Sequence, residues 1–188
     1  MKKIIVVTAS PRKGGNCDVM AETLRAAVPN AQVELFPLRD KTVNPCHACN
    51  ACKGKAAPAC VQADDMGALV SRLDACDAFV LIAPIYFGQL NGPAKTFIDR
   101  LYCFFDPQKP QGSAATRRGK KAALICSCGG GPVDVYTKYA KDTAACFSVA
   151  GADEVRAAVC GNGNTPGNCA KDEAFMRELR TLAAWLNA

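Results

Sequence analysis

Histidine and aromatic residues are scarce in this chain of 188 residues, which contains one histidine and only 7% Phe, Trp and Tyr. The single histidine, His47, lies inside a run of cysteines, so no Ser-His-Asp arrangement is available for nucleophilic catalysis. Apolar runs of about 18 residues, the length that a membrane-spanning helix needs, are also lacking. These absences predict no side-chain nucleophile or general base and no membrane partner.

The sequence shows neither a strong excess of charge nor a signal peptide. Its formal charge is +6, and the densest basic stretch, residues 117–121, precedes an apolar segment, as is typical of a solvated loop. We therefore expect no nucleic-acid partner. Residues 1–3 lead directly into a short apolar stretch, and twelve cysteines in a chain of this size favour buried thiols over a secreted disulfide scaffold. We expect a cytoplasmic protein with one domain over residues 1–188.

What the chain does contain is a concentrated set of cysteines within residues 44–65. Cys46, Cys49 and Cys52 follow one another at intervals of three, and Cys60 comes after a loop of small and turn-forming residues. Thiolates are soft ligands, and four around one centre suit zinc or an iron–sulfur cluster. Zinc sites usually combine two separated Cys-x-x-Cys pairs, whereas Cys-x-x-Cys-x-x-Cys is closer to the cubane clusters of bacterial ferredoxins. The pattern favours a cluster that Cys60 completes.

Two other interpretations of the cysteine run stay open at this point. The four thiols could form a metal-free loop that is reduced or redox-labile. They could also bind zinc, with His47 as a substitute ligand. The two aspartates that follow, Asp64 and Asp65, are interpreted first as helix-start residues.

Strand-like and helical segments alternate along the chain. Short apolar runs rich in β-branched residues predict buried strands, and amphipathic segments between them predict helices. We expect strands at residues 3–7, 32–36, 78–83, 121–126 and 154–160, and helices at about 16–29, 64–73, 94–103, 133–149 and 171–186. Five short strands alternating with helices define an open, doubly wound α/β sheet with helices on both faces.

The loop after the first strand, residues 8–17, is a candidate anion site. It joins a strand to a helix through small, hydroxyl and basic residues, an arrangement that points free backbone N–H groups and the positive helix end at an anion. The candidate phosphate binders are Ser10, Arg12, Asn16 and the backbone around Cys17. Neither a Gly-x-Gly-x-x-Gly fingerprint nor a Walker A motif is present. The alternative is that the two glycines of this loop only make a turn, and we favour the anion site.

Two later loops follow strands at the edge where open parallel sheets bind ligands. Pro84, Ile85, Tyr86 and Phe87 follow the most apolar strand and are placed to hold a flat ring, although the aromatic pair could also pack over the sheet edge. After the strand at 121–126, three glycines at 129–131 either let the backbone approach a ligand closely or give a flexible turn.

Three separated motifs, in this order, resemble the flavodoxin-like NAD(P)H-dependent FMN reductases. They are Thr-Ala-Ser-Pro-Arg-Lys-Gly-Gly-Asn at 8–16, Ala-Pro-Ile-Tyr-Phe-Gly at 83–88 and Gly-Pro-Ala-Lys-Thr-Phe-Ile-Asp-Arg at 92–100. The cysteine insert, about residues 44–63 between the second and third strands, resembles the iron–sulfur flavoprotein branch of that family. The likeness covers residues 3 to about 135.

The resemblance implies a flavodoxin-like sheet with strand order 2-1-3-4-5 and FMN at its carboxyl edge. The phosphate role falls on Ser10, Arg12, Asn16 and Cys17, although the family usually has Thr at the position of Cys17. Residues 84–87 would line the flavin ring, and its other side would be closed by Ser127, Gly129 and Gly130. The helix carrying Lys95 and Arg100 lies at dimer contacts in similar proteins, which implies a homodimer or homotetramer.

The function implied is an FMN-dependent oxidoreductase, linked to NAD(P)H or to ferredoxin, in which the flavin carries the chemistry. In the iron–sulfur version, Cys46, Cys49, Cys52 and Cys60 hold a [4Fe–4S] cluster that relays electrons to FMN and on to an acceptor. The alternatives are a cluster-free NAD(P)H-dependent reductase of FMN or quinones, and a flavodoxin-type electron carrier. Four further cysteines receive no role from the sequence: Cys126, Cys128, Cys160 and Cys169.

Overall fold

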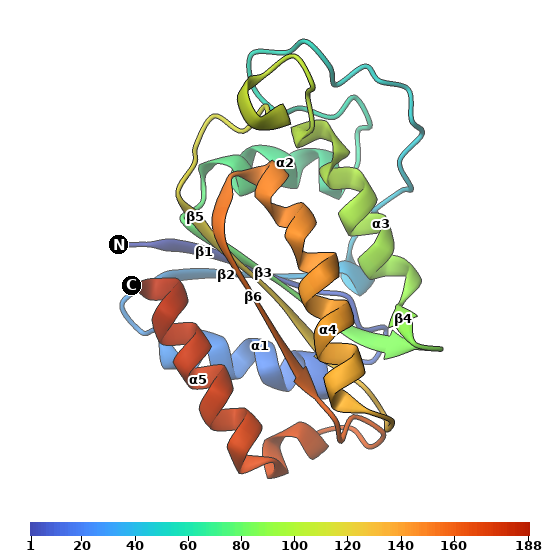
Figure 1. Ribbon diagram of the computed structural model, residues 1–188, viewed down its shortest axis with the longest axis vertical. Helices are drawn as coiled ribbons and strands as arrows, with labels where there is room; N and C mark the ends of the chain where they lie inside the picture. Colours follow the sequence, from blue (N-terminus) through green and yellow to red (C-terminus); the bar gives the residue numbers. More distant parts are fainter.

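The computed structural model describes residues 1–188 and has a twisted parallel sheet at its centre (Figure 1). Its five parallel strands lie in the order β2-β1-β3-β5-β6. Their bounds are Lys3–Thr8 for β1, Gln32–Pro37 for β2, Ala78–Tyr86 for β3, Lys120–Ser127 for β5 and Ala152–Cys160 for β6. Leaving out the short β4, this is the order 2-1-3-4-5, so the expected flavodoxin-like topology is confirmed.

Helices cover both faces of the sheet (Figure 1). On one face lie α1 (Asn16–Ala27) and α5 (Glu173–Asn187), and on the other lie α2 (Asp65–Ala75), α3 (Gly92–Arg100) and α4 (Val133–Ala144). Alternate residues of β1 enter different cores, Ile4 and Val6 on the α1 side and Ile5 and Val7 on the α2 side. Burial on both faces explains why the strands appear in the sequence as continuous apolar runs rather than alternating ones.

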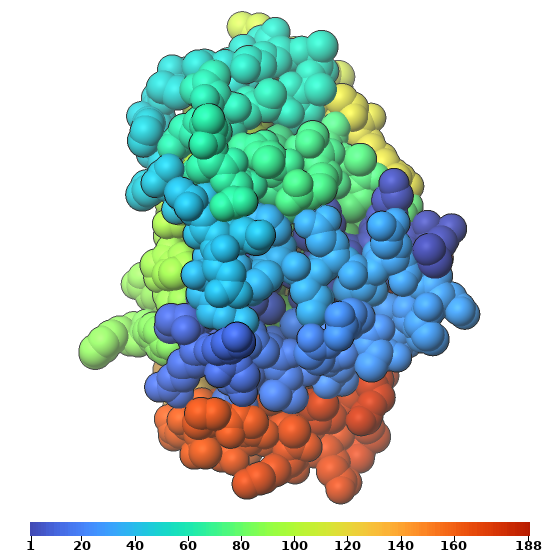
Figure 2. All heavy atoms as spheres, turned by 180° about the vertical axis from the view of Figure 1, so that it is seen from behind, coloured from blue at the N-terminus to red at the C-terminus, as the bar shows by residue number.

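The third parallel strand extends further than the sequence indicates. Pro84, Ile85 and Tyr86 were expected in a loop, but they continue β3, and the last two pair with a short antiparallel strand, β4 (Gln89–Leu90). The intervening Phe87 and Gly88 have φ angles of 49° and 77°, as a tight two-residue hairpin requires. This β3–β4 hairpin projects from the body of the molecule in the space-filling view (Figure 2).

Two helices end earlier than their sequence pattern suggests, because short 3₁₀ segments take over. After α3 the chain tightens into η2 (Leu101–Phe104), and after α4 into η4 (Ala145–Ala150). In η4, Phe147 packs on Phe79 of β3 with ring centroids 5.2 Å apart. The other 3₁₀ segments are η1 (Leu38–Asp40), η3 (Pro110–Gly112) and η5 (Asn168–Lys171). None of the helices has both the length and the apolar character that crossing a membrane requires.

Candidate functional site

A cavity of about 410 Å³ opens at the carboxyl edge of the sheet. The carboxyl ends of β1, β3, β5 and β6 meet there with the segments that follow them. The volume lies within the range of small-molecule and cofactor sites. The residues that line it are Ser10, Arg12, Gly15, Asn16, Cys17, Pro84, Ile85, Tyr86, Phe87, Ser127, Gly129, Gly163, Asn164 and Pro166.

The structure brings together ten of the eleven residues that the sequence proposes as cofactor contacts. They come from three segments that lie about 40 to 70 residues apart in the chain: 10–17, 84–87 and 127–129. Gly130 is the exception, because it follows Gly129 in the loop but does not line the cavity. Gly129 itself has no room for a side chain, since an added Cβ would overlap the side-chain amide of Asn164. The glycine thus allows the two loops to approach closely.

The end of the cavity nearest α1 has the character of an anion site. The helix begins at Asn16, so its first N–H groups lack intrahelical acceptors and the positive end of its dipole faces the loop. Ser10 is buried, and its Oγ accepts a hydrogen bond from the Arg12 backbone N–H at 3.1 Å. Gly15 occupies the N-cap, so no side chain caps the first N–H groups of the helix.

The side chain of Asn16 has a different task from the one the sequence suggests. Its Nδ2 donates to the carbonyl oxygens of Gly163 and Thr165 at 3.0 and 3.1 Å. Its Oδ1 accepts from the Cys169 N–H at 3.2 Å. The amide is therefore engaged by the segment after β6, and the backbone N–H is the group of Asn16 that stays a candidate for an anion.

The thiols around this cavity are buried and protonated. Burial, with a smaller contribution from Asp18, raises the pKa of Cys17 to about 12. Burial also raises the pKa of Cys126 to about 12 and that of Cys169 to about 11, and it raises the pKa values of Cys128 and Cys160. A neutral thiol at Cys17 adds no negative charge beside the anion site, and none of these groups has the thiolate character that reactive cysteines need.

The β3–β4 hairpin and the first loop are joined by one side chain. Asn91, which is 5% exposed, donates from Nδ2 to the carbonyl oxygen of Ala9 at 2.7 Å. Beside it, the Leu90 N–H donates to the hydroxyl of Tyr139 on α4 at 3.0 Å. These bonds fix the aromatic hairpin relative to the anion end of the cavity.

Sequence reasoning missed the wall of the cavity formed by Gly163, Asn164 and Pro166. These residues belong to a loop of Gly, Asn, Thr and Pro that was interpreted only as a connection. The signal that could have found them is topological. In an all-parallel sheet the loop after the last strand emerges at the same edge as the loops after the others.

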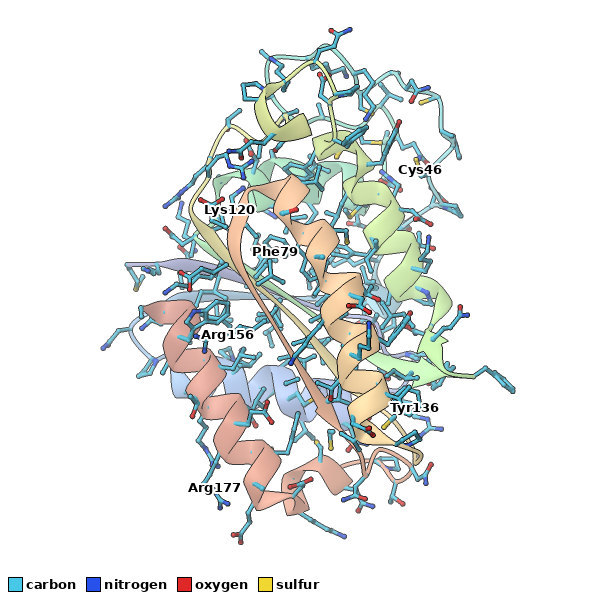
Figure 3. The ribbon with its side chains drawn as sticks, in the orientation of Figure 1. Cys46, Phe79, Lys120, Tyr136, Arg156 and Arg177 are labelled. Carbon is cyan, nitrogen blue, oxygen red and sulfur yellow. The ribbon has the colours of Figure 1, made fainter.

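The cysteine run lies apart from this cavity. Tyr136, near the start of α4 and against the glycine loop at 129–131, lies toward the bottom of the molecule in Figure 3, whereas Cys46 lies toward the top. Cys46, Cys49, Cys52 and Cys60 line a separate small cavity of about 20 Å³. All four are free thiols, and no group of three or more His, Cys, Asp or Glu side chains is arranged to hold a metal ion. The donor set has the soft chemistry of a cluster or zinc site, without its closed geometry.

A buried cation anchors the cysteine run to α3. The side chain of Arg100 is 1% exposed and donates to both oxygens of Asp64, at 2.6 and 2.8 Å. It also donates to the Cys60 sulfur at 3.3 Å and to the Asn44 carbonyl oxygen at 2.8 Å. Burial opposes ionisation of Asp64, but hydrogen bonds from Arg100, Asn44 and Gly67 outweigh it and lower the pKa of Asp64 to about 2. Asp64 is also the N-cap of α2, as expected.

A fifth thiol lies at the same small cavity, and the sequence did not point to it. Cys103 of η2 is buried among the cavity residues, and burial raises its pKa to about 12. Lys53 holds the loop to the same segment, because its Nζ donates to the carbonyl oxygens of Tyr102, at 2.7 Å, and Phe105. The loop is therefore tied to α3 and η2 from both of its halves.

Sequence comparison connects the chain to known flavoproteins. The profile of the family described as NADPH-dependent FMN reductase matches residues 2–151. An iron–sulfur flavoprotein of Archaeoglobus fulgidus is 33% identical over 125 residues, which are 65% of this chain and 53% of that protein. One from Methanocaldococcus jannaschii is 34% identical over 100 residues, 52% of this chain and 51% of the relative. The chain thus spans about half the length of these curated relatives.

Another relative aligns from end to end. A Bacillus subtilis protein assigned as an NAD(P)H-dependent FMN-containing oxidoreductase is 28% identical over 181 residues, 96% of each chain. Among solved structures, an NAD(P)H:quinone oxidoreductase from Methanothermobacter marburgensis superposes with a TM-score of 0.73 at 14% identity, over 100% of this chain and 98% of that one. An FMN-dependent NADH-azoreductase from Bacillus anthracis, solved with FMN, gives a TM-score of 0.70 at 14% identity over 99% and 100% of the two chains. At such identities the structures show a shared fold.

Proposed function

Since the chain belongs to the NADPH-dependent FMN reductase family, we propose that it is an FMN-dependent oxidoreductase and that the cavity at the carboxyl edge of the sheet is its FMN site. The observation that carries this proposal is the meeting of ten proposed contact residues at one cavity, from three separate segments of the chain. In this proposal residues 1–188 form one FMN-binding domain. The twelve free thiols suit a reducing cytoplasm.

The lining residues fit the two chemically different ends of FMN. The phosphate belongs at the start of α1, where Ser10, Arg12 and the backbone N–H groups of Asn16 and Cys17 offer donors and positive charge. The flat ring belongs between the apolar hairpin residues 84–87 and the loop carrying Ser127 and Gly129. Gly129 and Asn164, which approach each other closely, line that side of the cavity.

In this proposal no side chain of the protein forms or breaks a covalent bond. FMN, when bound, supplies the chemistry, because it accepts a hydride and releases electrons singly or in pairs. The protein binds the phosphate, orients the ring through the hairpin that Asn91 fixes, and shields one side of it with residues 163–166. The donor is a small molecule such as NAD(P)H in the simplest form of this activity.

In its finer form the proposal includes a [4Fe–4S] cluster held by Cys46, Cys49, Cys52 and Cys60. Support comes from the four-thiol donor set around one cavity and from the names of the curated iron–sulfur relatives. The run would receive electrons from an external donor such as ferredoxin. Because it lies at the far end of α3 from the flavin cavity, delivery to the FMN of another subunit in a homodimer or homotetramer is favoured over delivery within one chain.

The second candidate function is a cluster-free NAD(P)H-dependent reductase of FMN or quinones. One observation favours it: the cysteine thiols are not arranged around a common metal position. In that case the loop is held by Arg100 and Lys53 as a structural element, and its thiols are open to oxidation.

The deciding experiment is an absorption spectrum of protein purified without oxygen, with iron and acid-labile sulfide counted against FMN. We expect one FMN per chain, and roughly four irons and four sulfides if the cluster is present. Flavin bands without iron, together with rapid oxidation of NADPH, would select the cluster-free reductase. Protein that binds no FMN when it is supplied would contradict both.

A further inference from the structure

The first loop is held by a chain of two hydrogen bonds that begins outside the cavity. Nη1 of Arg39 donates to Oδ1 of Asp18 at 2.8 Å, and Oδ2 of Asp18 accepts from the Gly14 N–H at 2.7 Å. Arg39 comes from η1, directly after β2, and Asp18 lies in the first turn of α1. Three segments thus meet at one carboxylate.

Asp18 is useful to the loop and unfavourable to an anion. A carboxylate in the first turn of a helix stabilises its positive end, and here it also holds the Gly14 N–H in a loop position with a φ of 68°. The same negative charge lies in the same helical turn as the N–H groups that would receive a phosphate. Unless it is neutralised, it would repel the ligand that the loop is built to bind.

Arg39 supplies that neutralisation. The side chains of Arg39 and Asp18 are only 17% and 20% exposed, so water screens their interaction weakly. Apart from Asp18, the acidic group near Arg39 is Asp40, whose carboxylate lies 3.7 Å from Nε, beyond hydrogen-bonding distance. The buried Nε has no hydrogen-bond partner, so the directed interaction of this guanidinium is the one with Asp18. Arg39 does not line the cavity.

We propose that Arg39 is a positioning residue for the flavin phosphate, acting through Asp18 on the first loop. It holds the carboxylate in the orientation that fixes the Gly14 N–H, and it cancels the charge that would oppose the phosphate. This inference rests on the proposed FMN site. It makes a prediction that a purely structural role does not make, because only a ligand with a phosphate senses the charge of Asp18.

The test compares FMN with riboflavin, which shares the ring and lacks the phosphate. Each flavin is titrated by fluorescence into the flavin-free 188-residue chain, and the ratio of the two dissociation constants is the readout. Arg39→Gln should weaken FMN binding roughly tenfold while leaving riboflavin binding within about twofold. Adding Asp18→Asn should return the ratio toward that of the wild-type protein, because the unpaired negative charge is then absent. Arg39→Lys, which keeps the charge, should stay close to the wild-type ratio.

A matched control lies about two turns further along the same helix. Arg25 forms an exposed ion pair with Glu22, and Arg25→Gln should not change the ratio. Equal affinities of the wild-type protein for FMN and riboflavin would overturn the proposal that the first loop binds the phosphate. A wild-type preference for FMN that persists in Arg39→Gln, or a double variant that fails to restore it, would overturn the role of Arg39 alone.

Discussion

Arg100 and Asp64 form a bidentate ion pair whose side chains are only 1% and 2% exposed, and the same guanidinium donates to the sulfur of Cys60. The pair links the end of α3 to the N-cap of α2 and to the cysteine run. One buried cation therefore links the end of α3 to the cysteine run and to the start of α2, which follows that run directly.

Removing one partner of this pair should destabilise the fold strongly. Arg100→Met keeps most of the volume but leaves the Asp64 carboxylate buried without a cation, which typically costs about 3–5 kcal/mol. The free energy of unfolding, measured by urea titration, should fall by an amount in that range. Arg25→Met, in an exposed pair, should change it by less than about 1 kcal/mol. Equal changes in the free energy of unfolding for the two variants would show that the buried pair contributes no more to stability than the exposed one.

The same carboxylate predicts a dependence of stability on pH. The folded-state pKa of Asp64 is about 2, below its ordinary value of 3.8, so ionised Asp64 stabilises the folded state above pH 4. That contribution should be lost as the pH falls from about 4 to 2. Between pH 4 and pH 2, the free energy of unfolding should therefore fall more steeply with falling pH for the wild-type protein than for Asp64→Asn. Identical slopes would contradict the assignment.

A methyl group at Gly129 should close part of the cavity. Gly129→Ala places its Cβ against the Asn164 amide, which must then move, and we expect FMN affinity to fall roughly tenfold. Asn164→Ala in the same chain removes the overlap and should restore part of the loss. Gly92→Ala is the matched control, because an added Cβ at Gly92 meets open space. Flavin fluorescence titration measures the wild-type protein, both single variants, the double variant and Gly92→Ala, and additive effects of the two substitutions would argue against direct contact.

The exposed cysteine Cys49 separates the two candidate functions. If the run holds a cluster, Cys49→Ala should abolish iron binding and the associated colour while FMN stays bound. Cys146→Ala, at an exposed thiol outside the run, should leave both unchanged. Iron and flavin content of anaerobically purified protein provide the measurement. Loss of FMN with retention of iron would contradict the placement of the two sites.

The strands and helices could be predicted from local sequence pattern, whereas the strand order and most of the flavin contacts were implied by the resemblance to the FMN reductases. Apolar runs identify the strands, and the ends of parallel strands fall on one edge. Asn16 shows where such reasoning stops, since its side chain turns toward Gly163 and Thr165, about 150 residues away in the chain. Cys103 was missed for the same reason, because only tertiary packing places it among the cysteines of the run.

The two groups of cysteines should differ in their reactivity toward reagents that modify thiols. The cysteines around the cavity of the sheet edge are buried and hold their protons, whereas those of the run are half-buried or exposed. Alkylating agents and peroxides attack accessible thiolates, so they will reach the run and the exposed Cys146 before the buried cysteines around the cavity. A brief treatment can therefore modify the cysteine run and leave the cavity thiols unmodified. The contribution of the run to activity can then be measured in the wild-type protein, without a substitution.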